Sequence, residues 1–157
     1  MSLSDISNAL LKEQALLEML LFKLEEEHLI LAAGRTRWLA AATREVEAVL
    51  AEIRRCELLR ATLVAGAAPG LGLGANPSLR DLAEAAPAPW DFVLDQHRRS
   101  FLEIADDIGA QANANKQLLN RGAAATKDLL ERAARERAAG RAGARGNETS
   151  FLVDQAL

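Results

Sequence analysis

Leucine recurs at every seventh position along the first 31 residues of the chain. The five positions are Leu3, Leu10, Leu17, Leu24 and Leu31. Because seven residues make almost two turns of an α-helix, this spacing places all five side chains along one side of a single helix. That side must be covered by other helices, so the repeat predicts an all-α protein in which long helices pack together.

Composition supports this fold class and excludes several functions. The chain has 157 residues, enough for one domain, and its 4% aromatic content with half the residues hydrophobic is typical of alanine- and leucine-rich helices. A formal net charge of −3 gives no electrostatic basis for binding nucleic acid. The single cysteine, Cys56, cannot form an intrachain disulfide, which excludes a secreted disulfide scaffold.

Apolar periodicity and breaker residues divide the chain into helices. The expected ranges are 3–33, 36–65, 78–85 and 89–138. Gly34 leaves room only for a tight hairpin, so the first two helices should pack antiparallel. Ser78 and Asp81 resemble a capping box, and Pro89 suits the start of the last helix. We expect a three-helix bundle or coiled coil of long antiparallel helices over residues 1–139, with one short extra helix.

The C-terminal residues differ from the rest. Residues 140–157 have the composition of a flexible tail, and the tail ends in an apolar group, Phe151, Leu152 and Val153. This group is too short to form a stable helix alone. Two interpretations remain open: the group docks into an apolar groove of its own bundle or of a neighbouring molecule, or it stays disordered.

Residues able to do chemistry are few and scattered. His28 and His97 lie on different expected helices, without the spacing of metal ligands. Cys56 falls on a core position of the second helix and is expected to be a small buried side chain. Glu25, Glu26 and Glu27 are expected to form a solvated face. We therefore predict that the chain has no catalytic, cofactor-binding or metal-binding site and that it is not an enzyme.

The location follows from segments that lack targeting features. The N-terminus has no basic region of the kind that opens a secretory signal. The longest uncharged run, between Arg60 and Arg80, contains prolines and glycines that exclude a membrane span. We expect a cytoplasmic protein with no stable membrane insertion.

The third long helix carries the most unusual pattern. Gln111 and Asn115 occupy lines that are otherwise apolar. They can fix the register of a helix pair, form a solvent-exposed edge, or face a groove that a partner helix fills. We take this helix as the candidate partner-binding face. Its expected contact residues are Phe101, Ile104, Ile108, Asn115, Leu118 and Leu119.

Three stretches resemble the FlgN family of flagellar type III export chaperones. They are residues 10–28, the Arg- and Glu-rich helix after Gly34 that reaches Arg60, and residues 113–119. Family members typically carry two asparagines three residues apart, followed by an apolar pair. Here Asn115 with Leu118 and Leu119 fits, whereas the earlier position is Ala112, with Asn113 beside it. The resemblance covers about residues 3–130.

The resemblance implies a function as well as a fold. It implies that the chain binds the amphipathic C-terminal segments of hook-associated (junction) proteins, prevents their premature assembly, and presents them to the export apparatus. It implies neither a nucleotide nor a metal.

Two alternatives remain. One is a structural coiled coil whose heptads serve self-association, since the sequence leaves a homo-oligomer open. The other is a membrane-surface adaptor that uses a basic stretch. That stretch consists of Arg132, Arg135, Arg137, Arg141 and Arg145.

Overall fold

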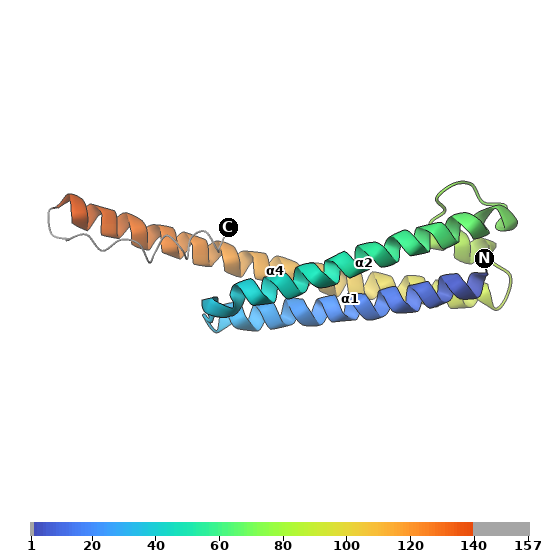
Figure 1. Ribbon diagram of the computed structural model, residues 1–157, viewed down its shortest axis with the longest axis horizontal. Helices are drawn as coiled ribbons and strands as arrows, with labels where there is room; N and C mark the ends of the chain where they lie inside the picture. The colour runs from blue at the N-terminus through green and yellow to red at the C-terminus, as the bar shows by residue number, and fades with distance from the viewer. Residues whose placement is uncertain (1, 140–157) are drawn as a thin grey trace.

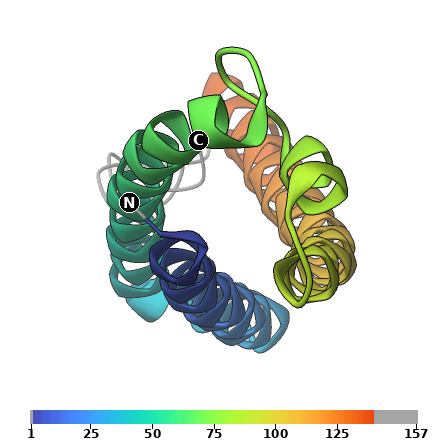
Figure 2. The same cartoon turned by 90° about the vertical axis from the view of Figure 1, so that its right-hand side faces the viewer.

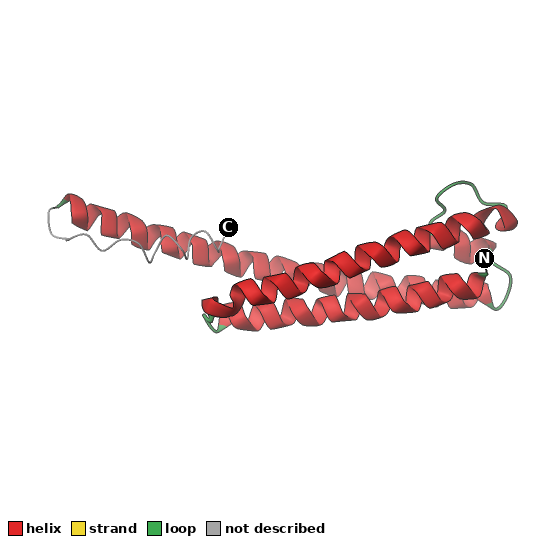
Figure 3. Cartoon of the chain, viewed as in Figure 1, coloured by secondary structure: helices red, strands yellow, loops and turns green. Residues whose placement is uncertain are grey.

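The structure is a computed structural model that describes residues 2–139, and the expected all-α fold is confirmed (Figure 3). The helices are α1 (Leu3–Ala32), α2 (Leu39–Ala67), α3 (Leu79–Ala85) and α4 (Trp90–Ala138). Short 3-10 turns at Thr36–Trp38 and Ala68–Leu71 flank α2. Residues 2–139 contain no strand. The apolar tail residues Phe151, Leu152 and Val153 lie outside the described residues.

Local sequence signals set the helix ends. Ser2 caps α1 in a capping box with Asp5, and Ser78 caps α3 in the same way with Asp81. After α1, Gly34 adopts a left-handed backbone with φ of 66°, and its N–H donates to the carbonyl of Leu31. A residue without a side chain adopts this conformation at little cost, so Gly34 ends the helix and starts the hairpin.

The three long helices are not equivalent, because α1 lies between the other two (Figure 2). α2 packs antiparallel along α1, as the short hairpin predicts, and α4 also packs along α1. Packing between α2 and α4 is slight by comparison. α4 runs parallel to α1, since α2 returns the chain to the end at which α1 begins and the connection through α3 stays at that end (Figure 1). The bundle is therefore built on α1 and is more open than the expected three-helix bundle of antiparallel helices.

The apolar core consists of two clusters along α1. The first joins α1, α2, α3 and α4, and its buried members are Ile6, Leu10, Val64, Leu82, Ala83, Ala86 and Leu94. The second joins α1 and α2, with members Leu20, Leu24, Val46 and Ile53. Leu10 and Leu24 belong to the heptad seam, so this seam forms the core as expected. α3 covers the first cluster with the buried side chain of Leu82, and this explains why so short a helix stays in place.

α4 is much longer than its partner helix. His28, near the end of α1, lies beside Asn115, and α1 ends one turn later at Ala32. α4 continues from Asn115 to Ala138, so about 19 of its residues, roughly 28 Å of helix, extend past the end of α1. Figure 1 shows this part of α4 projecting beyond the hairpin between α1 and α2.

Candidate partner-binding surface

The six residues expected to contact a partner all lie on α4, but the structure gives them different roles. Phe101 is half-buried against the first core cluster, and Ile108 is half-buried against the second. Ile104 is also half-buried, on the same side of the helix. The part of the expected face that runs from Phe101 to Ile108 therefore packs within the chain and helps to hold α4 on α1.

Asn115 is buried, with 2% of its surface exposed, and its hydrogen bonds join α4 to α1. Its Nδ2 donates to the carbonyl of Leu24 at 2.8 Å and to Oε1 of Glu27 at 3.1 Å. Its Oδ1 accepts from Nε2 of Gln111 at 3.0 Å, and Nδ1 of His28 lies at the same distance from it. Asn115 is therefore not at a solvent-exposed edge, and it can fix the register of α4 against α1.

Glu27 extends this polar cluster to α2. Its other carboxylate oxygen, Oε2, accepts from the hydroxyl of Thr43 at 3.2 Å, and Glu27 is only 7% exposed. The expectation that Glu25, Glu26 and Glu27 form one solvated face is therefore wrong for Glu27. The reason is that α2 and α4 meet α1 on different sides, and Glu27 lies where both can reach it.

Other buried polar groups also serve packing between helices. Ser7 Oγ and His97 Nε2 lie 2.9 Å apart, and burial lowers the pKa of His97. Glu13 on α1 pairs with Arg60 on α2, with Oε2 and Nε 2.8 Å apart. Burial raises the pKa of Glu13, while the positive charge of Arg60 opposes that rise. The first pair therefore joins α4 to α1, and the second joins α2 to α1.

Cys56 is buried as expected. Its thiol lies 3.6 Å from the carbonyl of Ala9, to which it donates, and burial raises the pKa of this thiol. A buried thiol with a raised pKa is a poor nucleophile. Across residues 2–139, no three His, Cys, Asp or Glu side chains are grouped so as to hold a metal ion.

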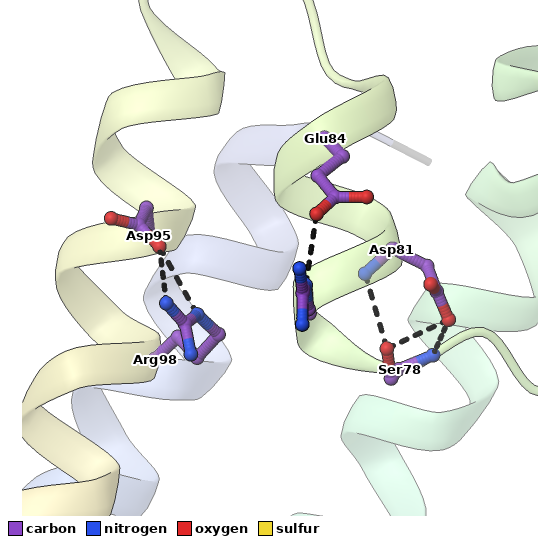
Figure 4. Close-up of polar contacts among 6 residues, drawn as sticks. Ser78, Asp81, Glu84, Asp95 and Arg98 are labelled. Carbon is purple, nitrogen blue, oxygen red and sulfur yellow. Dashed lines mark hydrogen bonds and ion pairs between the residues drawn. The ribbon is translucent and has the colours of Figure 1, made fainter.

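A groove between α3 and α4 has mostly charged walls (Figure 4). Arg80 pairs with Glu84 at 2.9 Å along α3, and Asp95 pairs with Arg98 at 3.0 Å along α4. On the side of α3 away from α4, the hydroxyl of Ser78 donates to Asp81, and this bond lowers the pKa of that carboxyl. The ion pairs run within single helices, so the groove offers mainly self-paired charge.

The projecting part of α4 carries apolar side chains that continue the apolar face of its packed part. We call Leu118, Leu119, Leu129 and Leu130 the projecting stripe. Leu129 is 58% exposed and the other three are half-buried. Neither core cluster includes an α4 residue beyond Ile108. Since α1 ends level with the beginning of this stripe, most of it has no helix of residues 2–139 packed on it.

A second apolar surface was missed by the sequence analysis. Leu11, Met19, Phe22 and Leu29 on α1 are each between 46% and 68% exposed, and we call them the outer stripe. Spacings of 11 and 7 residues place Leu11, Phe22 and Leu29 within about 20° of one line on the helix. The sequence shows this spacing, but Leu11 and Phe22 also flank the leucine seam, and the seam was the stronger signal.

In residues 2–139, no helix combines the length and the apolar character needed to cross a membrane.

Comparison with known families gives one match. The family described as FlgN protein matches residues 1–147, which is nearly the whole chain. No curated protein and no solved structure matches significantly.

Proposed function

The chain belongs to the FlgN family of flagellar export chaperones, and on this premise we propose that it binds the amphipathic C-terminal segment of a hook-associated protein. The proposed binding surface is the projecting stripe on α4. A client helix would lie on α4 in line with α1 and continue the packing that α1 makes on the earlier turns. This is the helix-in-groove mode of peptide recognition, in which apolar side chains at helical spacing anchor the peptide.

One observation carries the proposal: the apolar line of α4 continues past the point where α1 ends. Leu118 and Leu119 belong to the face expected from the sequence, and Leu129 and Leu130 extend it by three turns, about 16 Å. Phe101, Ile108 and Asn115 were part of the same expected face. They pack within the chain here, so in our proposal they anchor α4 and do not contact the client.

The proposed role follows from the chemistry of such a client. An amphipathic segment exposes an apolar face before assembly, and that face drives premature association. Covering it on α4 would keep the client monomeric in the cytoplasm until the complex reaches components of the export apparatus. The activity is then binding, without a cofactor or a reaction step.

Calorimetry with the full-length protein tests the proposal. A peptide with the sequence of a hook-associated C-terminal segment should bind with one-to-one stoichiometry. The heat-capacity change should be negative, because apolar surface is buried on both sides. At about 50 μM peptide, any complex with a Kd of that order or tighter is substantially formed. Lack of binding to every hook-associated C-terminus at this concentration would refute the proposed client.

A paired substitution locates the surface. Leu129→Asp with Leu130→Asp should weaken client binding at least about tenfold, since two apolar anchors are replaced by charges. The matched control is Leu58→Asp. Leu58 is 70% exposed and lies on another helix, α2, far from the stripe in sequence. Circular dichroism should show the same helicity for both variants. Equal affinity of the two variants would place the client elsewhere.

A further inference from the structure

The outer stripe of α1 has a strongly acidic setting. α1 contains six acidic and two basic residues, and the exposed Glu18 and Glu25 alternate along the helix with Leu11, Phe22 and Leu29. Glu18 lies within about 20° of their line and Glu25 about 40° from Leu11. This side of α1 faces away from both α2 and α4, because the core residues of α1 occupy its other sides. This side of α1 therefore alternates apolar and acidic side chains, and the fold leaves it exposed.

The projecting part of α4 has the opposite charge. Residues 120–138 contain five basic and three acidic side chains, whereas the whole chain has a net charge of −3. Arg132 and Arg135 lie in its last turns, on the exposed surface, and Arg132 pairs with Asp128 of the same helix at 2.8 Å. A basic helix with an apolar stripe and an acidic helix with an apolar stripe are complementary in charge and in polarity.

The two surfaces also match in length. The outer stripe from Leu11 to Leu29 extends about 27 Å, close to the roughly 28 Å of α4 that projects. The two surfaces cannot meet within one chain, because α4 is a continuous helix that points away past the end of α1.

We propose that the projecting part of α4 docks on the outer stripe of α1 in a second copy of this chain. The apolar contact joins Leu129 and Leu130 of one copy to Phe22 and Leu29 of the other. Arg132 and Arg135 then lie near Glu18 and Glu25, and the charges fix which surfaces pair.

The direction of the helices gives this contact a closed form. α4 runs parallel to α1 in one chain and projects past the hairpin end. Two copies that meet hairpin to hairpin about a two-fold axis place each projecting α4 beside the α1 of the other copy, running antiparallel to it. Both contacts form together, so the assembly closes as a dimer and does not grow into a filament.

The dimer covers the stripe that we propose for the client, a consequence that depends on the proposed function. In the client-free state the second copy would shield the apolar side chains of α4, and a client would displace it. The existence of the dimer does not depend on the client and can be tested without one.

Sedimentation equilibrium of the client-free, full-length protein tests the inference. At about 100 μM the mass should approach twice the 16.9 kDa of one chain. Phe22→Asp with Leu29→Asp should raise the dimer dissociation constant at least about tenfold, because both apolar contacts are lost. Leu58→Asp, an equally exposed leucine on α2, should leave the dimer unchanged. A monomer at this concentration, or equal dimerisation of the two variants, would overturn the proposal.

Charge exchange identifies the pairing surfaces. Glu18→Arg with Glu25→Arg should weaken the dimer, and adding Arg132→Glu with Arg135→Glu in the same chain should restore it. Without that restoration, Glu18 and Glu25 of α1 do not meet the basic end of α4, and the proposed pairing is wrong.

Client titration separates this inference from the proposed function. Phe22→Asp with Leu29→Asp should retain client binding, with equal or higher affinity, because α4 is untouched. A dimer that forms as described, in a protein that binds no hook-associated peptide, would refute only the proposed client. Client binding without any dimer would refute only the inference.

Discussion

The two halves of α4 form one continuous helix but differ in what covers them. From Trp90 to Asn115 the apolar side packs on α1 and α3, and its polar members have buried partners such as Ser7 and Glu27. From Lys116 to Ala138 the same side continues, and the core clusters contain none of its residues. The comparison shows that an amphipathic pattern indicates a face that needs a partner, while the lengths of the neighbouring helices decide whether that partner belongs to the same chain.

The largest expected effect contrasts a leucine in each half. Leu94 is fully buried, so Leu94→Ala should lower the free energy of unfolding by about 3 kcal/mol through lost apolar contact and a cavity. Leu129→Ala removes a side chain that is exposed in the single chain, so its effect on the monomer, measured far below the concentration at which the dimer is expected, should stay within about 0.5 kcal/mol. Urea unfolding followed by circular dichroism measures both. Similar losses for the two variants in the monomer would show that the projecting half is packed within its own chain.

The second effect tests the boundary between the halves. Asn115→Ala removes the amide that donates to Leu24 and Glu27, and we expect a loss of about 2 kcal/mol because buried polar groups lose their partner. Asn113→Ala is the matched control, since Asn113 is exposed on the same helix, and it should change stability little. If the two variants have equal stability, the Asn115 cluster does not hold α4 in register.

The fold was largely predictable because its signals are local. The heptad of Leu10 and Leu24, the glycine at position 34, and the Ser78–Asp81 capping box each depend on residues close in sequence. The observed helices begin and end within about three residues of the expected ranges, as is usual for helix termini. What the sequence did not predict is that α1 would be the shared partner of α2 and α4, since this depends on how three helices meet in space.

The candidate surface was predictable only in part, for the same reason. Periodicity placed Phe101, Ile108 and Leu118 on one face, but it could not tell that α1 would cover the first two and end near the third. Glu27 looked like one of three solvated glutamates until its position between Asn115 and Thr43 was known. Burial of a polar side chain depends on its neighbours across the bundle, and these are distant in sequence.

The smallest expected effect concerns pH and the packed half of α4. Burial lowers the pKa of His97, so the unfolded chain, in which the ordinary value is 6.5, takes up a proton more readily than the folded chain as the pH falls. The free energy of unfolding should therefore decrease between pH 7.5 and 5.5. In His97→Gln, which can keep a hydrogen bond to Ser7, this decrease should be smaller, whereas Asn113→Ala should keep the full decrease of the parent protein. Urea unfolding at the two pH values measures the difference. If the decrease in the free energy of unfolding is unchanged in His97→Gln, the pH dependence of stability comes from the protonation of other groups and not from this buried imidazole.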